Sequence, residues 1–82
     1  MDYDKIKKAF YAEDVKKFIK EKHNVSVPGF WKWFFSENHL NCISTYEEEA
    51  DDFPKYKKYI LLLIQEFKKD SCGDVIWFFS RD

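Results

Sequence analysis

The chain has few of the residues that mark loops, disulfide frameworks and phosphate sites: 2 glycines, 2 prolines and 2 cysteines in 82 residues. Gly29 and Gly73 belong to no P-loop or Rossmann pattern, so the common nucleotide-binding loops are excluded. Two cysteines in a chain without an export signal are more often reduced than paired. We therefore expect Cys42 and Cys72 to be thiols, with a single disulfide between them as the open alternative.

The chain also lacks a long apolar run and is poor in arginine. Its longest apolar run, Tyr59 to Ile64, is six residues, whereas a membrane-spanning helix needs about 18 or more. Met1 to Asp4 do not form the basic and apolar start of a secretory signal, so we expect a cytoplasmic protein. One arginine, Arg81, and a net charge of −1 do not favour a dedicated nucleic-acid binder.

Aromatic side chains are in excess, at 9 Phe, 5 Tyr and 3 Trp. Each ring needs about 150–250 Å² of cover when buried, and a domain of this size buries little more than about 60% of the surface that its unfolded chain exposes. Some rings should therefore lie at the surface. The densest stretch, Phe30 to Phe35, has five rings in six positions, which no single face of a helix or strand can hold.

Apolar residues spaced three and four apart predict an all-α fold, a compact bundle of five or six short helices forming one domain over residues 1–82. Two apolar stripes at different angles near the N-terminus predict a break or a sharp bend at 11–13, followed by a helix over 14–22. The clearest helix is 54–69, whose apolar stripe is typical of a core-facing helix.

For two stretches the sequence does not decide between a helix and a strand. Periodicity does not decide 30–35, and 75–79 fits either a buried strand or a last helix capped by Asp74. The alternative fold is therefore α+β, with short strands near 24–27, 40–44 and 75–79.

Residues 44–47 fit the capping-box pattern, in which a Ser hydroxyl and a Glu carboxylate satisfy backbone N–H groups at the start of a helix. A short acidic helix is expected from Ser44. Asp52 or Phe53 should then cap the following helix, because Pro54 suits a first helical turn.

From Phe30 onward the order of short motifs resembles that of YozE-type proteins, small bacterial domains with a sterile-alpha-motif-like (SAM-like) helical fold. The matching segments are Phe30 to Phe34, Ile43 to Tyr46, Glu48 to Asp52, Phe53 to Lys55, Tyr59 to Phe67 and, for the family's final short helix, Gly73 to Trp77. The connections are shorter here, and residues 1–27 have no counterpart. The resemblance implies a SAM-like fold for residues 30–82 and carries no activity or catalytic residue.

The surplus of aromatic residues suits the anchors of a protein interface, which are enriched in Trp and Tyr. We predict a non-enzymatic protein-binding module or regulator without cofactor or metal, whose partner is another protein or a second copy. Three sets of residues are the candidates for partner binding: Trp31, Trp33 and Phe34; Leu61 and Leu62; and the acidic set Glu47, Glu48, Glu49, Asp51 and Asp52. For each ring and leucine, the alternative is a core position.

Two other functions are weighed against this one. A narrower hypothesis is a phage or mobile-element factor whose five acidic residues replace phosphates in the nucleic-acid site of a host protein. The runner-up is a small DNA- or RNA-binding regulator, in which the lysines of the Lys16 to Lys22 helix face contact phosphates while Trp31 or Trp33 stacks on bases. A solvated lysine-rich face is the simpler interpretation of that helix.

Metal and nucleophile chemistry have little support. His39 and Cys42 are close in sequence, but His23 and Cys72 are distant, and a structural zinc site needs four ligands that usually come in paired clusters. We therefore expect no metal site and no catalytic residues.

Overall fold

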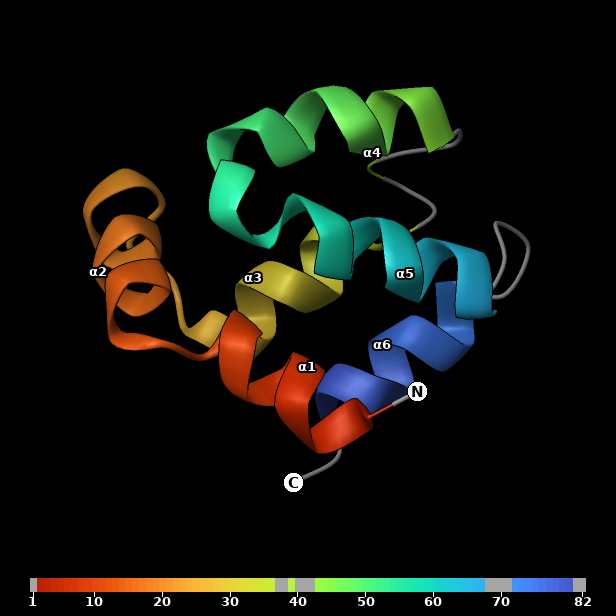
Figure 1. The fold of residues 1–82 in the computed structure, drawn as a ribbon. Helices are drawn as coiled ribbons and strands as arrows, with labels where there is room; N and C mark the ends of the chain where they lie inside the picture. The colour runs from red at the N-terminus through yellow and green to blue at the C-terminus, as the bar shows by residue number, and fades with distance from the viewer. Residues whose placement is uncertain (1, 37–38, 40–42, 68–71, 81–82) are drawn as a thin grey trace.

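The computed structural model describes residues 2–36, 39, 43–67 and 72–80, and these residues form helices and no strand (Figure 1). The helices are α1 (Tyr3–Phe10), α2 (Glu13–Lys22), α3 (Val27–Phe34), α4 (Ile43–Glu49), α5 (Lys57–Phe67) and α6 (Cys72–Ser80), with the 3-10 helices η1 (Ala50–Asp52) and η2 (Pro54–Tyr56) between α4 and α5. The predicted all-α fold is confirmed. The alternative strands at 24–27 and 75–79 are wrong; of the third, residues 43–44 are helical and 40–42 lie outside the described residues.

The predicted break between the first two helices is present, because α1 ends at Phe10 and α2 begins at Glu13. Asp2 starts α1 by accepting a hydrogen bond from the backbone N–H of Lys5 at 3.1 Å. Asn24 follows α2 with a φ of 53°, a left-handed conformation that asparagine tolerates better than most residues. The chain can then turn directly into α3.

The aromatic stretch forms a helix because its start is capped. The Ser26 hydroxyl accepts a hydrogen bond from the N–H of Gly29 at 3.2 Å, and Pro28 lies in the first turn. A Cβ on Gly29 would lie 2.8 Å from the Ser26 hydroxyl oxygen, so a larger residue would push against the cap.

The later helices begin slightly away from the predicted positions. Helix α4 starts at Ile43, one residue before the predicted cap, and the expected helix from 54 opens as η2 before it becomes α5 at Lys57. Phe53 precedes η2 without a side-chain cap. Asp74 lies in the first turn of α6 instead of capping it.

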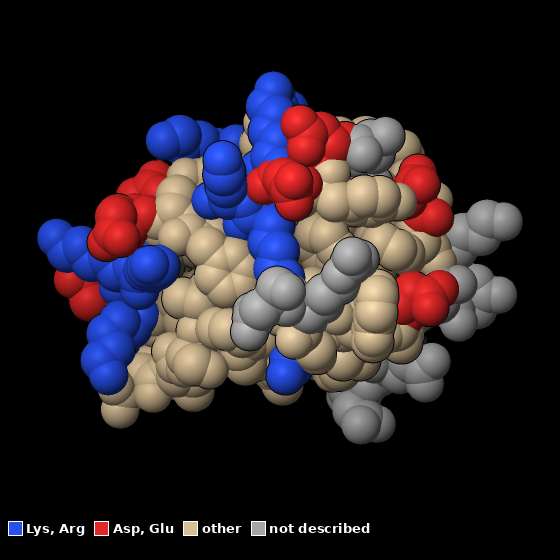
Figure 2. Space-filling model, turned by 90° about the horizontal axis from the view of Figure 1, so that it is seen from below, with Lys and Arg blue, Asp and Glu red and all other residues tan. Residues whose placement is uncertain are grey.

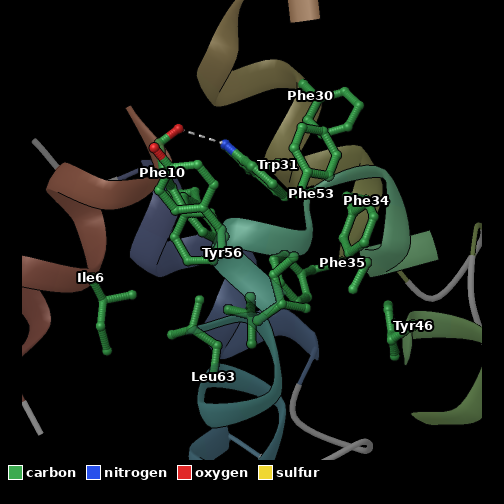
Figure 3. Close-up of a cluster of buried hydrophobic side chains, with 14 of the residues drawn as sticks. Ile6, Phe10, Phe30, Trp31, Phe34, Phe35, Tyr46, Phe53, Tyr56 and Leu63 are labelled. Atoms are coloured by element: carbon green, nitrogen blue, oxygen red, sulfur yellow. Dashed lines mark hydrogen bonds between the residues drawn. The ribbon is translucent and has the colours of Figure 1, made fainter. Parts of the chain in front are cut away.

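One cluster of buried apolar side chains includes residues from every α-helix and from η1 and η2. Trp31 lies within it and is fully buried, with its ring centroid 4.5 Å from that of Phe10 and 5.2 Å from that of Phe53 (Figure 3). Its indole N–H donates to the backbone oxygen of Phe10 at 3.0 Å. The core is thus closed around a hydrogen-bonded tryptophan.

Helix α6 packs extensively against α3 and is tied to the N-terminal part of the chain. The Lys7 ammonium donates to the backbone oxygen of Phe78 at 3.1 Å, and the Tyr11 hydroxyl donates to that of Phe79 at 3.4 Å. These donors satisfy carbonyls in the last turn of α6, which have no partner within the helix.

Candidate protein-binding surface

Two of the residues predicted to contact a partner lie in the core instead. Trp31 is 0% exposed and Phe34 is 1% exposed, because both share the inward side of α3 with Phe30. Direct partner contact by Trp31 or Phe34 is therefore wrong for this structure. Their rings stabilise the fold.

Trp33 is the ring of α3 that reaches the surface, with 45% of the residue exposed. At 100° per residue, it lies on the flank of α3 opposite Trp31 and Phe35, the residues that contact Phe79 of α6. Its ring is held by neighbours: the His39 ring centroid lies 3.6 Å away and the His23 centroid 6.1 Å away. Trp33 is therefore exposed but supported on its surroundings.

His39 joins Trp33 to α4. Its Nε2 lies 3.0 Å from Oε2 of Glu49, and both side chains are partly covered. The side-chain contacts from Trp33 to His39 and from His39 to Glu49 bring together residues from α3 and α4. The aromatic and acidic candidates, distant in sequence, thus meet in the fold.

The acidic candidates line the outer side of α4 and η1. Tyr46 and Ala50 face the core, Glu49 is half-buried, and the remaining acidic residues are exposed, namely Glu47, Glu48, Asp51 and Asp52. Asp51 accepts a hydrogen bond from Lys57 at 2.8 Å, which raises the pKa of Lys57. We give the name α4 surface to the following residues: Trp33, His39, Glu47, Glu48, Glu49, Asp51 and Asp52.

The predicted leucine pair is split by α5. Leu62 is 42% exposed, whereas Leu61 is half-buried, since Ile60, Leu63 and Ile64 take the core-facing side. Leu62 follows Lys58 by four residues and shares its outward side of the helix. Of the predicted pair, Leu62 is therefore the residue that is open to a partner.

Trp77 is not among the residues predicted to bind a partner. It is the most exposed large apolar residue among those described, at 61%. If 75–79 is taken as a helix, its spacing separates two sides. Val75, Phe78 and Phe79 then share one side, which places Trp77 on the other.

The lysine-rich helix α2 presents its charges to solvent. Lys16, Lys17, Lys20 and Lys22 are exposed, and Lys16 pairs with Glu13 at 3.5 Å. At the start of α2, Asp14 accepts a hydrogen bond from the Tyr56 hydroxyl at 2.8 Å, which lowers the pKa of Asp14. Helix α2 thus carries three acids as well as its lysines, and it is joined to η2 by this hydrogen bond.

No group of three or more His, Cys, Asp or Glu in the described ranges is arranged to hold a metal ion. Of the described helices, none is both long and apolar enough to cross a membrane. Cys42, half of the weak His39–Cys42 pair, lies outside the described residues. No family model, no curated protein and no solved structure matches the chain.

Proposed function

We propose that the protein is a non-enzymatic binding module that contacts another protein through the α4 surface. The observation that carries the proposal is Trp33, a large ring left 45% exposed yet supported by His39 and His23. Tryptophan is enriched among the few residues that dominate interface energy. A ring that is already positioned loses little freedom on binding, which favours affinity.

The charge beside Trp33 suggests the character of the partner. Glu48 and Asp52 are exposed within the α4 surface, and Lys32 is the only lysine or arginine between 24 and 53. A basic surface on the partner would be attracted to this region and oriented by it. The proposed partner therefore presents a cationic patch around a pocket for an indole ring.

The test begins with affinity capture from the native cell and identification of the captured chains, followed by calorimetry with the purified partner. Trp33→Ala should weaken binding about 30-fold, the effect of losing a 2 kcal/mol anchor. Trp77→Ala is the matched control, since it removes an equally large exposed ring from a different helix. It should change affinity less than about threefold.

Equal losses in the two variants, or no loss in Trp33→Ala, would remove the α4 surface from the proposal. Glu48→Lys provides an independent arm, because reversing a rim charge should slow association and reduce its salt dependence. Melting temperatures of all variants should stay close to the wild type, so that any lost binding is not lost folding.

Three narrower expectations belong to this proposal. The phage or mobile-element factor would use the acidic set in place of phosphates, but Glu49 and Asp51 already pair with His39 and Lys57. Fewer of the five carboxylates are therefore free to take the place of phosphates. A cytoplasmic setting and kinship of residues 30–82 with the YozE-type, SAM-like proteins also remain hypotheses, and neither names a partner.

The second candidate function is single-stranded nucleic-acid binding. The favouring observation is that Trp33 lies 6.1 Å, ring to ring, from His23, which directly follows Lys22 at the end of α2. A base stacked on Trp33 would place its phosphate near the end of α2, where Lys22 supplies a positive charge. The acids interspersed along α2, Glu13 and Glu21 among them, weaken this surface.

A salt titration separates the two functions. Binding of a labelled oligonucleotide should fall steeply with salt, and charge reversal at Lys16 and Lys17 should weaken it while leaving protein binding through α4 intact. Absence of oligonucleotide binding at low salt would eliminate the second candidate.

A further inference from the structure

The chain has 2 histidines, and the rings of both lie beside the exposed indole of Trp33. The ring centroid of His39 is 3.6 Å from that of Trp33, and the centroid of His23 is 6.1 Å away. They come from different parts of the chain, because His23 follows α2 whereas His39 lies between α3 and α4. Histidine is the side chain whose ordinary pKa, about 6.5, puts its change of charge between pH 5 and 8.

The side of the molecule away from α4 has charges of a different kind. Figure 2 shows this side from below, and lysines and acidic residues are mixed on it. Lysine, aspartate and glutamate ordinarily keep their charges between pH 5 and 8. The net charge of −1 that the chain has with neutral histidines becomes +1 when both take up a proton. These two added charges both fall beside Trp33.

His39 is held between the Trp33 ring and a carboxylate. Its Nε2 lies 3.0 Å from Oε2 of Glu49, and 17% of its side chain is exposed. An ionised carboxylate only accepts hydrogen bonds, so Nε2 is the donor and a second proton enters at Nδ1. The ring of Phe34, with its centroid 6.3 Å away, is uncharged. The titratable groups around His39 are therefore Glu49 from α4 and, against the same indole, His23 from the end of α2.

We propose that acid weakens the binding of a cationic partner to the α4 surface, because protonation of His39 adds a positive charge beside Trp33. This inference rests on the proposed function, in which the cationic patch of the partner surrounds the indole. One proton on His39 offsets the charge of Glu49 and lies in contact with the ring that the partner would enclose. His23 acts in the same direction but more weakly, since its ring is farther from Trp33 and exposed to solvent and salt.

The size of the effect is limited by linkage between the proton and the partner. A partner that disfavours the protonated form is bound less tightly as that form becomes populated. For one histidine of ordinary pKa, the loss of affinity between pH 7.5 and 5.5 is at most about tenfold. Acid therefore moderates binding through Trp33 and does not abolish it.

The first test measures the charge beside Trp33 in the purified full chain, without a partner. A cationic nitroxide, aminomethyl-PROXYL, and an anionic one, carboxy-PROXYL, each enhance the NMR relaxation of the indole N–H proton according to the local charge. From pH 7.5 to 5.5, the ratio of the cationic to the anionic effect should fall at least about twofold, as expected for one charge added a few ångströms away. The indole of Trp77 on α6 is the internal control, and its ratio should change less.

Two matched variants assign the change to one histidine. His39→Gln keeps an N–H donor for Glu49 but gains no charge in acid, so it should remove most of the change in the ratio. His23→Gln should leave most of it. The wild type supplies a check that depends on no variant, because the ratio at Trp33 should change over the same pH interval as the ring signals of His39.

The second test repeats the calorimetry with the captured partner at pH 7.5 and 5.5. Affinity should fall at least about threefold in the wild type and clearly less in His39→Gln. The proposal is overturned by a ratio at Trp33 that does not change with pH, or by a pH dependence of the ratio or of the affinity that persists in His39→Gln. Absence of binding at both pH values would remove the proposed function and this inference together, whereas an unchanged nitroxide ratio removes this inference alone.

Discussion

Helices α3 and α6 pack side by side, and both are short and rich in aromatic residues, yet they use their tryptophans differently. Each helix directs one side into the core and leaves one tryptophan outside, Trp33 on α3 and Trp77 on α6. Trp33 is supported by two histidines and joined through His39 to an acidic helix. Trp77 lies on a face with one charge.

The difference shows that exposure alone does not define the use of an aromatic residue. A ring supported beside many like charges suits a partner of opposite charge, and this is the basis for the α4 surface. Trp77 has no such charged setting within its own helix, because Asp74 is the one charged residue of α6. Neighbouring groups, more than the tryptophans themselves, separate the two surfaces.

The largest expected effect comes from the buried tryptophan of α3, Trp31. Trp31→Ala should destabilise the protein by about 3–5 kcal/mol, because it removes a fully buried ring and leaves a cavity. This loss is comparable with the whole stability of many small domains, about 5–15 kcal/mol. Urea unfolding followed by circular dichroism measures it.

Trp31→Phe is the matched control for the cavity. Phenylalanine keeps most of the apolar volume, so its cost in stability should be clearly smaller than that of alanine. The remaining cost comes from the lost N–H, which donates to the Phe10 oxygen. A loss of less than about 1 kcal/mol for Trp31→Ala would contradict the placement of this ring in the core.

The helical fold could be predicted because its signals are local. The two apolar stripes on either side of residues 11–13, and the stripe beginning at Pro54, depend on spacing within one helix. Residues 75–79 could not be assigned, since a short run that is apolar throughout has no periodicity. Packing against α3 and α5 decides which side of that segment is buried.

The candidate surface was predictable only in part, because burial depends on contacts between distant elements. The number of rings in 30–35 indicates that some lie outside, but it does not distinguish Trp31 from Trp33. The choice between them is made by Phe10 and Phe79, which pack on Trp31 from α1 and α6. Likewise, the pairing of Glu49 with His39 joins residues ten apart through the fold.

A second prediction compares how the two helices are held at their ends. Ser26→Ala should cost about 1 kcal/mol, since it removes the hydroxyl that accepts from the Gly29 N–H at the start of α3. Ser80→Ala on α6 is the matched control. Its hydroxyl donates to the Ile76 oxygen within the same helix, on the exposed side, and its loss should be nearly neutral. Urea midpoints of the two variants in parallel decide this, and equal losses would be inconsistent with the cap.

A third prediction uses pH to distinguish the hydrogen bond that holds α2 from those that hold α6. Helix α2 packs against α3. The hydrogen bond from Tyr56 lowers the pKa of Asp14, so the folded state binds this proton less tightly than the unfolded chain. The resulting stabilisation is fully present above the ordinary aspartate pKa, about 3.9. It is lost as pH falls through the lower folded pKa.

The measurement is the difference in urea midpoint between the wild type and Asp14→Asn, followed from neutral pH to about pH 2.5, below the ordinary aspartate range. The difference should shrink with acid, because the protonated wild-type carboxyl resembles the amide. The α6 ties run from Lys7 and Tyr11 to backbone oxygens and contain no carboxylate. Lys7→Met should therefore show a deficit that stays constant over the same range, and a deficit that shrinks with acid would contradict this assignment.

The smallest expected effects belong to the two surface tryptophans. Trp77→Ala should change stability by about 0.5 kcal/mol or less, as surface substitutions usually do. Trp33→Ala should cost slightly more, about 0.5–1 kcal/mol, because its ring loses contact with His39 and His23. Both values are measured by urea unfolding. A loss above about 2 kcal/mol for either variant would show that its ring supports the fold, and the surface built on that ring would then lose its main argument for binding a partner.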